Sequence, residues 1–347
     1  MERKSLYDLS WQVSEEEYRA DPAYSYSTIA RFNKEGFDNL NRLYDKLETP
    51  SLLFGSMVDT LLTDGQEEFD RRFEVAQFPD IPDSIIKIVK DVFREFSLTH
   101  KRLEDIPDSE IIFRAITANY QSNWKPETRA KVIKEKGSNY YQLLYLSTNK
   151  TLVNQNDYQD ACECVDILRS HEYTKKYFEP NNPFNTDIEK FYQLKFKGDW
   201  EGIPLRGMMD LIIVDHKNKL IIPCDLKTSG KKEWNFFKSF INFEYWIQAQ
   251  LYWYLIKQNI SQDPFYKDYK LLDFRFIVIN RYNKLPLVWE YRDTQAIVDL
   301  YYGKNKQIIC RNWRNILEEL DYYITNKPIY PVGIKEINDI IKYLNNE

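Results

Sequence analysis

The sequence has few of the residues that several protein classes require. It contains four cysteines and ten glycines in 347 residues. Cys162, Cys164, Cys224 and Cys310 are too few and too scattered for a disulfide framework, which is typical of a reducing compartment. No apolar run is long enough to cross a membrane, and the N-terminal segment lacks the apolar stretch of a signal peptide. We therefore expect a soluble cytoplasmic protein with no membrane partner.

The sequence also has no large excess of positive or negative charge. The 48 Lys and Arg residues face 53 Asp and Glu, and the net charge of -5 excludes an extended basic coat for nucleic acid, although not a localised basic groove. Aromatic residues, in contrast, make up 16% of the chain. With no repeat or linker visible, we expect one domain over 1–347 of the α/β (α+β) class, with a mixed central sheet flanked by helices.

Hydrophobic spacing predicts a mostly helical part over 1–180. Ser25 or Ser27 is the candidate N-cap of the first helix. Apolar residues over 51–62 cover more than one helix face, so this helix should be largely buried, and it contains a single acid, Asp59. Further helices are expected over 83–96, 108–119, 125–136 and 158–177.

After residue 180 the pattern becomes that of strands. Segments 188–196, 205–214 and 220–226 predict a three-stranded meander with turns at 199–202 and 216–219. A helix over 234–258 is followed by strands at 274–279 and 287–291, and a helix is expected over 295–325. The sheet should therefore occupy 185–292, with C-terminal helices over 293–347.

Two acids and a lysine stand out within these strands. Asp210 lies on the second strand of the meander and Asp225 on the third, while Asp225 and Lys227 are two positions apart and so point to the same face. Carboxylates that meet in an apolar sheet repel unless a cation lies between them, and a hard divalent cation is the usual solution. The pattern predicts a metal site; for either acid alone, a strand-end residue paired with Lys227 remains an alternative.

This arrangement resembles the PD-(D/E)xK nuclease superfamily, whose signature is an acid on one strand and an (Asp/Glu)-x-Lys on the next. Asp210 matches the first acid, and Asp225-Leu226-Lys227 matches the second element. The resemblance implies the restriction-endonuclease-like core of that superfamily. It also implies that the two acids and the Leu226 carbonyl hold Mg²⁺ or Mn²⁺, and that Lys227 assists the attacking water or stabilises developing charge.

The helix after this motif narrows the resemblance to the RecB-like branch. It carries Gln248-Ala-Gln-Leu-Tyr252, with Gln and Tyr one helical turn apart. In that branch the Gln and Tyr support the site or contact DNA, so both are candidate catalytic residues. Glu189 matches an additional acid near the metal site, with the neighbouring Asp187 and a solvent-facing role for Glu189 as alternatives.

Two N-terminal segments are similar to RecE-like phage exonucleases. Ser25-Tyr-Ser27 resembles their Ser-x-Ser helix start, and Gly55-x-x-x-Asp59 resembles their Gly-x-x-x-His helix. Asp59 stands where that family has a metal-binding His. Because Asp also ligates magnesium, Asp59 is a candidate metal ligand, and a hydrogen-bonded structural Asp is the alternative.

The resemblance implies a metal-dependent exonuclease that digests linear double-stranded DNA from 5′ to 3′ in phage-type recombination. DNA, a single-strand annealing protein and a homo-oligomeric ring are the partners and assembly that it implies, in the host cytoplasm. Two alternatives stay open. One is a structure-specific or restriction-like endonuclease, and the other is an inactive DNA-binding or assembly protein of the same fold.

Basic and polar residues around the motif are candidates for a phosphate-binding track. They are Arg206, Ser229, Lys231, Lys232 and Lys238, with ordinary solvated surface residues as the alternative. Nearby aromatics either stack on bases or pack in the core, and these are Trp234, Phe236, Phe237 and Trp246. The sequence contains no P-loop, no cysteine set for an iron–sulfur cluster and no nucleophile elbow beside its three histidines.

Overall fold

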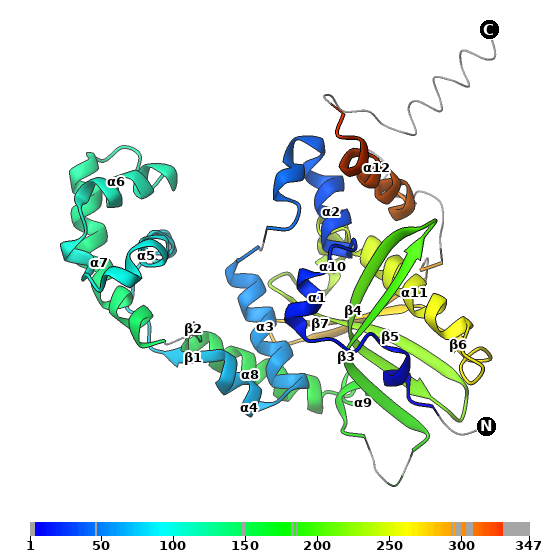
Figure 1. Cartoon of the computed structure of the whole chain (residues 1–347). Coiled ribbons are helices and arrows are strands. Elements are labelled where there is room, and N and C mark those ends of the chain that lie inside the picture. The colour runs from blue at the N-terminus through cyan, green and yellow to red at the C-terminus, as the bar shows by residue number, and fades with distance from the viewer. Residues whose placement is uncertain are drawn as a thin grey trace. The chain divides into compact units, whose positions relative to one another are not determined.

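The computed structural model describes residues 4–45, 47–147, 150–181, 184, 186–292, 294–295, 300–302 and 308–328. The chain divides into two compact units, one formed by Met1–Gly55 with Cys164–Glu347 and the other by Ser56–Glu163 (Figure 1). We predicted a single domain, whereas the structure has two compact units. Both boundaries fall inside helices, α3 (Pro50–Thr63) and α8 (Gln155–Ser170), so no linker composition marks them.

The first unit is built on a mixed sheet, as predicted. Its strands run in the order β3 (Ile188–Trp200), β4 (Ile203–Asp215), β5 (Leu220–Ser229), β7 (Phe274–Asn280) and β8 (Pro286–Tyr291), and β6 (Lys270–Leu271) also pairs with β5. Neighbouring strands are antiparallel except that β5 runs parallel to β6 and β7. The predicted meander is thus confirmed, and its strands are longer than expected. Strand β5 is antiparallel to β4 and parallel to β6 and β7.

The helices of the first unit cover this sheet and one another. They are η1 (Leu6–Leu9), α1 (Glu15–Ala20), α2 (Tyr26–Glu35), η2 (Phe37–Arg42), α9 (Lys175–Phe178), η5 (Glu233–Asn235), α10 (Phe236–Asn242), α11 (Tyr245–Ser261) and α12 (Trp313–Asn326). Helix α11 packs on β3, β4 and β7, and α2 packs on α11 and α12 (Figure 1). The apolar residues of these contacts form one continuous core.

Two helix predictions in this unit need adjustment. The helix expected over 234–258 is split, because Glu244 has a left-handed backbone (φ 56°) between α10 and α11. The helix expected over 158–177 ends at Ser170, and α9 follows separately. Ser25 is the N-cap of α2, as predicted, and its backbone N–H donates to the Thr28 hydroxyl at 2.8 Å.

The predicted helix over 295–325 is wrong in its first half. Residues Leu300–Tyr302 (β9) and Ile308–Cys310 (β10) form a short antiparallel pair, in keeping with their β-branched and aromatic residues. Residues 296–299, 303–307 and 329–347 lie outside the described part of the chain. Helix α12 begins after Asn312, whose side chain accepts a hydrogen bond from the Arg314 N–H.

The second unit is mainly helical, as predicted for this part of the chain. It contains α4 (Gln66–Arg72), β1 (Phe73–Ala76), α5 (Asp83–Phe96), η3 (Ser97–Thr99), η4 (Leu103–Asp105), α6 (Asp108–Thr117), α7 (Pro126–Leu146) and β2 (Thr151–Asn154). Helices α5, α6 and α7 pack around their own apolar core, and β1 pairs with β2 in parallel. Among the described helices of both units, none combines the length and apolarity that a membrane span requires.

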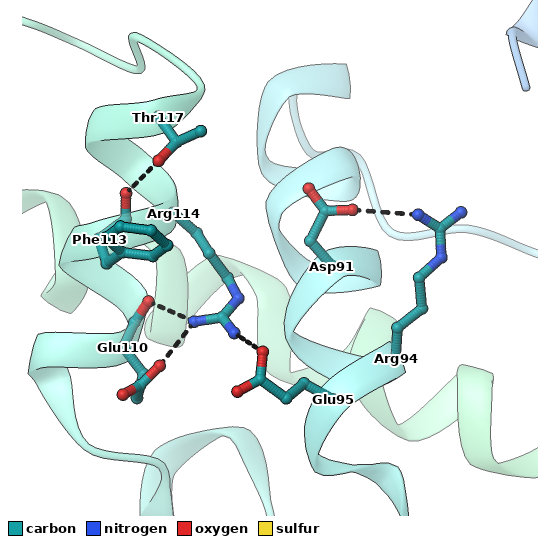
Figure 2. Close-up of polar contacts among 7 residues, drawn as sticks. All are labelled: Asp91, Arg94, Glu95, Glu110, Phe113, Arg114 and Thr117. Carbon is teal, nitrogen blue, oxygen red and sulfur yellow. Dashed lines mark hydrogen bonds and ion pairs between the residues drawn. The ribbon is translucent and has the colours of Figure 1, made fainter. Parts of the chain in front are cut away.

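Charged residues link two helices of this unit. Arg114 on α6 donates to Glu95 on α5, and to both the backbone and the side-chain carboxylate of Glu110 one turn earlier (Figure 2). The Arg114 side chain is 10% exposed and that of Glu95 is 61% exposed, so this ion pair lies at the surface and adds little to the stability of the unit. The packing of α6 on α5 depends mainly on their apolar core.

Helix α7 approaches α5 closely at Gly137. A Cβ atom at Gly137 would lie 2.6 Å from Val89 Cγ2, and Val89 is fully buried. We predict that Gly137→Ala lowers the free energy of unfolding by about 1–3 kcal/mol, because the added methyl overpacks this contact. In a Val89→Ala background the same substitution should cost less, since the facing side chain is smaller. Urea denaturation of the four proteins measures this coupling, and additive effects of the two substitutions would contradict it.

Candidate active site

The two predicted acids lie opposite each other where β4 and β5 separate. The last backbone pair of this ladder is Leu211 with Cys224, and the same register continued by one residue places Asp210 opposite Asp225. Beyond that point the backbone of β5 bonds to a side chain of β4 in place of its backbone: the Leu226 N–H donates a hydrogen bond to Asp210 Oδ2 at 2.9 Å. The side chain of the first acid is thereby fixed against the backbone of the Asp-x-Lys motif.

Asp225 is the most enclosed of these groups, with 2% of its surface exposed. Its Oδ1 accepts a hydrogen bond from Gln248 Nε2 at 2.6 Å, and its Oδ2 lies 2.6 Å from Lys227 Nζ. Gln248 comes from α11 and is itself buried. The structure therefore brings Asp210, Asp225, Lys227 and Gln248 together, from two strands and one helix.

The charge of Lys227 is maintained by its neighbours. Burial opposes the charged ammonium, but the Asp225 and Asp210 carboxylates hold the pKa of Lys227 above its ordinary value. Its Nζ also lies 4.6 Å from the centre of the Tyr245 ring, within the range of a cation–π interaction. Lys227 thus remains a cation at neutral pH and contacts Asp225 directly.

Three tyrosines lie near this cluster, and only Tyr252 was predicted from the sequence. Burial raises the pKa of Tyr252, and of Tyr26 and Tyr245, above the ordinary value, and the Asp225 carboxylate adds to each shift. The three phenols therefore stay neutral and act as hydrogen-bonding groups. Tyr26 and Tyr245 were not predicted, although their positions in the sequence could have indicated them. Tyr245 lies one helical turn before Gln248, and Tyr26 is the middle residue of the Ser-x-Ser segment.

Local backbone features make room for these side chains. Gly207 on β4 leaves space for the Tyr252 ring, because a Cβ at this position would lie 3.0 Å from the ring. On the other side of β4, Gln193 of β3 adopts a left-handed conformation (φ 52°) and interrupts the ladder between the pairs Tyr192–Leu211 and Leu194–Met209. The irregularity falls at the position that faces Asp210, and strained backbone of this kind often occurs near functional sites.

The first turns of α3 belong to the same unit and approach β5. A Cβ at Gly55 would lie 3.3 Å from Thr228 Oγ1, so the small residue permits this contact next to Lys227. Asp59 lies one turn further along α3, in the segment that belongs to the second unit. Its role as a metal ligand stays a prediction.

Glu189, also predicted for the site, lies in a different polar contact. Its Oε2 is 2.9 Å from Nε2 of His216, whose Nδ1 is 2.8 Å from the Tyr269 hydroxyl. In the β3–β4 ladder Glu189 pairs with Val214, toward the turn and away from Asp210. These contacts tie Glu189 to His216 in the β4–β5 turn, and its catalytic role stays a prediction.

Arg206 was predicted to bind phosphate, but its side chain is buried and is not available to a ligand. It is 6% exposed, it donates to the backbone carbonyls of Tyr18 and Ala23, and its guanidinium lies 4.7 Å from the centre of the Tyr18 ring. The sequence could not show that the N-terminal segment covers this arginine. Lys231, Lys232 and Lys238 are exposed, as a phosphate contact requires.

The remaining predicted residues follow β5 into a loop. Ser229 is half-buried at the end of β5, and its hydroxyl accepts a hydrogen bond from the Lys231 N–H at 3.0 Å. Phe236 and Trp246 are buried and belong to the core, whereas Trp234 is 72% and Phe237 is 38% exposed. The core alternative thus holds for Phe236 and Trp246, and base stacking stays a prediction for Trp234 and Phe237.

The donor set at this site suits a hard divalent cation. Two carboxylates face each other at the end of a ladder, and the single ammonium of Lys227 balances one of their two charges. In the described parts of the chain no group of three or more His, Cys, Asp or Glu side chains is placed to hold a metal. Magnesium is commonly bound through one or two carboxylates together with waters and substrate phosphates, which is the donor number that Asp210 and Asp225 offer.

Comparison with known proteins adds little to these observations. No family model and no curated protein matches the chain. The chain is similar to the crystal structure of the protein named "Putative exonuclease" from Eubacterium rectale, with a TM-score of 0.45 and 13% sequence identity, over 94% of this chain and 91% of that chain. A likeness at this level does not carry a function from one protein to another. The function therefore has to be argued from the site itself.

The ion pair of Lys227 with Asp225 yields a stability prediction. Lys227→Met leaves the Asp225 carboxylate buried without its cation, which should lower the free energy of unfolding by roughly 3 kcal/mol in EDTA. The double variant Asp225→Asn with Lys227→Met removes both charges and should recover most of that loss. Urea denaturation measures both, and a double variant no more stable than the single one would contradict the pairing.

Proposed function

We propose that this chain is a metal-dependent deoxyribonuclease that hydrolyses phosphodiester bonds in DNA. The observation that supports the proposal is the convergence of Asp210, Asp225 and Lys227, with Gln248 behind them. A pair of carboxylates next to a charged ammonium can bind a divalent cation and, beside it, the negative charge of a phosphate. The same arrangement matches the PD-(D/E)xK pattern in the sequence.

Each side chain has a separate task in this proposal. Asp210 and Asp225, with the Leu226 carbonyl, would hold Mg²⁺ or Mn²⁺, which supplies Lewis acidity and lowers the pKa of bound water. Lys227 stabilises the negative charge that develops on the attacked phosphate. Gln248 donates to Asp225 and so holds this carboxylate in one orientation, which makes Gln248 a positioning residue. Tyr252 and Tyr245 close the site as neutral phenols.

The finer assignment follows the resemblance to RecE-like exonucleases. We propose digestion from the ends of linear double-stranded DNA, from 5′ to 3′, as in phage-type recombination, with a single-strand annealing protein as partner and a homo-oligomeric ring as assembly. A restriction-like endonuclease is the second candidate, since the same acids and lysine serve that chemistry. The substrate experiment distinguishes the two.

The proposal predicts a metal-dependent loss of linear DNA. Purified protein is incubated with end-labelled linear duplex and with closed circular duplex, in magnesium, in manganese and in EDTA. We expect the linear duplex to be degraded in either metal, the circle to survive, and EDTA to stop the reaction. Nicking or cutting of the circle would identify an endonuclease. No cleavage of either substrate in either metal would reject the nuclease proposal.

Variants locate the activity at the proposed site. Asp225→Asn should lower the rate by at least about 100-fold, because it removes a charged group in direct contact with the reaction centre. Glu290→Gln on β8 is the matched control: it removes an acid from the same sheet that pairs with Arg275, and the rate should stay unchanged. Equal losses in both variants would place the activity elsewhere. Asp59→Ala tests separately whether this acid is a further ligand.

A further inference from the structure

Two loops leave the sheet at the end that carries Lys227. Strands β5 and β7 are parallel, and Ser229 at the end of β5 pairs with Asn280 at the end of β7. The chain after each strand therefore emerges at the same edge, as residues 230–235 and 281–285. Lys227 lies three residues before the first of these loops. Whatever binds to the loops lies next to the candidate active site.

Hydrogen bonds fasten the two loops to each other. The Arg281 N–H donates to the Ser229 carbonyl at 2.9 Å, and the Asn280 side chain donates to the Lys231 carbonyl at 2.8 Å. The Asn283 side chain donates to Glu233 Oε1 at 2.8 Å. The Tyr282 ring also lies so close to Gly230 that a Cβ there would be 3.1 Å away. The loops thus form one preformed surface.

This surface presents aromatic rings to solvent. Trp234 is 72% and Tyr282 is 75% exposed, whereas Phe236 and Phe240 of the following helix α10 are buried in the core. Because these two rings stay in solvent, they lose the favourable burial of apolar surface that the neighbouring aromatic residues gain. Their exposure on two joined loops beside Lys227 leaves the rings accessible to a ligand at the edge of the site.

Positive charge accompanies the rings. Lys231 and Lys232 are exposed on the same loop, and Lys232 Nζ lies 5.1 Å from the centre of the Trp234 ring. Aromatic faces with adjacent cations are complementary to nucleic acid bases and phosphates, respectively. A duplex hides the faces of its internal bases, so only unpaired bases can stack on Trp234 and Tyr282.

We propose that Trp234, Tyr282, Lys231 and Lys232 form a platform on which the unpaired bases of single-stranded DNA stack. This aromatic platform gives the nuclease a second substrate contact, specific for a single strand at the edge of the site. The inference rests on the proposed function for the nature of the polymer, but binding to the platform is measured without cleavage.

The experiment measures binding of the full chain in EDTA by fluorescence anisotropy. The probes are labelled oligo(dT) of about 20 nucleotides, an abasic strand of equal length and a blunt duplex. The double variant Trp234→Ala with Tyr282→Ala should bind oligo(dT) at least about tenfold more weakly, since each lost stack weakens binding severalfold or more. Its affinity for the abasic strand should not change, because that strand keeps the phosphates and lacks the bases.

Matched variants separate stacking from other effects. Tyr173→Ala removes an aromatic ring that is 59% exposed elsewhere in the same unit, and it should leave all affinities unchanged. Trp234→Phe keeps a ring and should retain most of the oligo(dT) affinity, whereas Trp234→Leu should not. Lys231→Ala with Lys232→Ala should weaken binding of oligo(dT) and of the abasic strand alike.

Two results would overturn the platform. One is unchanged oligo(dT) binding by the Trp234 and Tyr282 double variant, and the other is an equal loss on the abasic strand. Failure of the nuclease proposal is a different result: the wild-type protein would cleave no DNA in magnesium or manganese while the loss of oligo(dT) binding in the double variant persisted.

Discussion

The rest of the site depends on the meeting of two carboxylates at the end of the β4–β5 ladder. Asp210 and Asp225 face each other in register, and Asp225 is almost fully buried. Such a pair is unfavourable without positive charge, so the surrounding groups are arranged to supply it or to orient the acids. Lys227 contacts Asp225 directly, Gln248 fixes its other oxygen, and the Leu226 N–H fixes Asp210.

The mixed sheet explains why this meeting can occur beside a substrate-binding surface. Strand β5 is antiparallel to β4 over its first half and parallel to β7 over its second half. The change of partner frees the backbone around Leu226 for Asp210, and it sends the loops after β5 and β7 to one edge. One strand thus supplies an acid, a lysine and the loop that carries Trp234, which links the proposed cleavage site to the proposed platform.

Much of this arrangement could be predicted from the sequence, because strand alternation fixes which residues share a face. Asp210, Asp225 and Lys227 follow from two short strands and a turn, and Gln248 follows from its helix. Burial of Arg206 could not be predicted, since it depends on carbonyls of residues far away in the chain. The position of Tyr26 near the cluster and the exposure of the two rings likewise depend on tertiary packing, and the unit boundaries fall inside helices that the sequence shows as continuous.

The central claim is that Asp210 and Asp225 hold a divalent cation together, and binding of Mn²⁺ to the full-length protein tests it most directly. Electron paramagnetic resonance of free Mn²⁺, titrated with wild-type protein and with Asp210→Asn and Asp225→Asn, reports the bound fraction without reference to catalysis. The account predicts saturable binding by the wild type that is lost or greatly weakened in both variants, and unchanged in Glu290→Gln. Equal Mn²⁺ binding by all four proteins would contradict it.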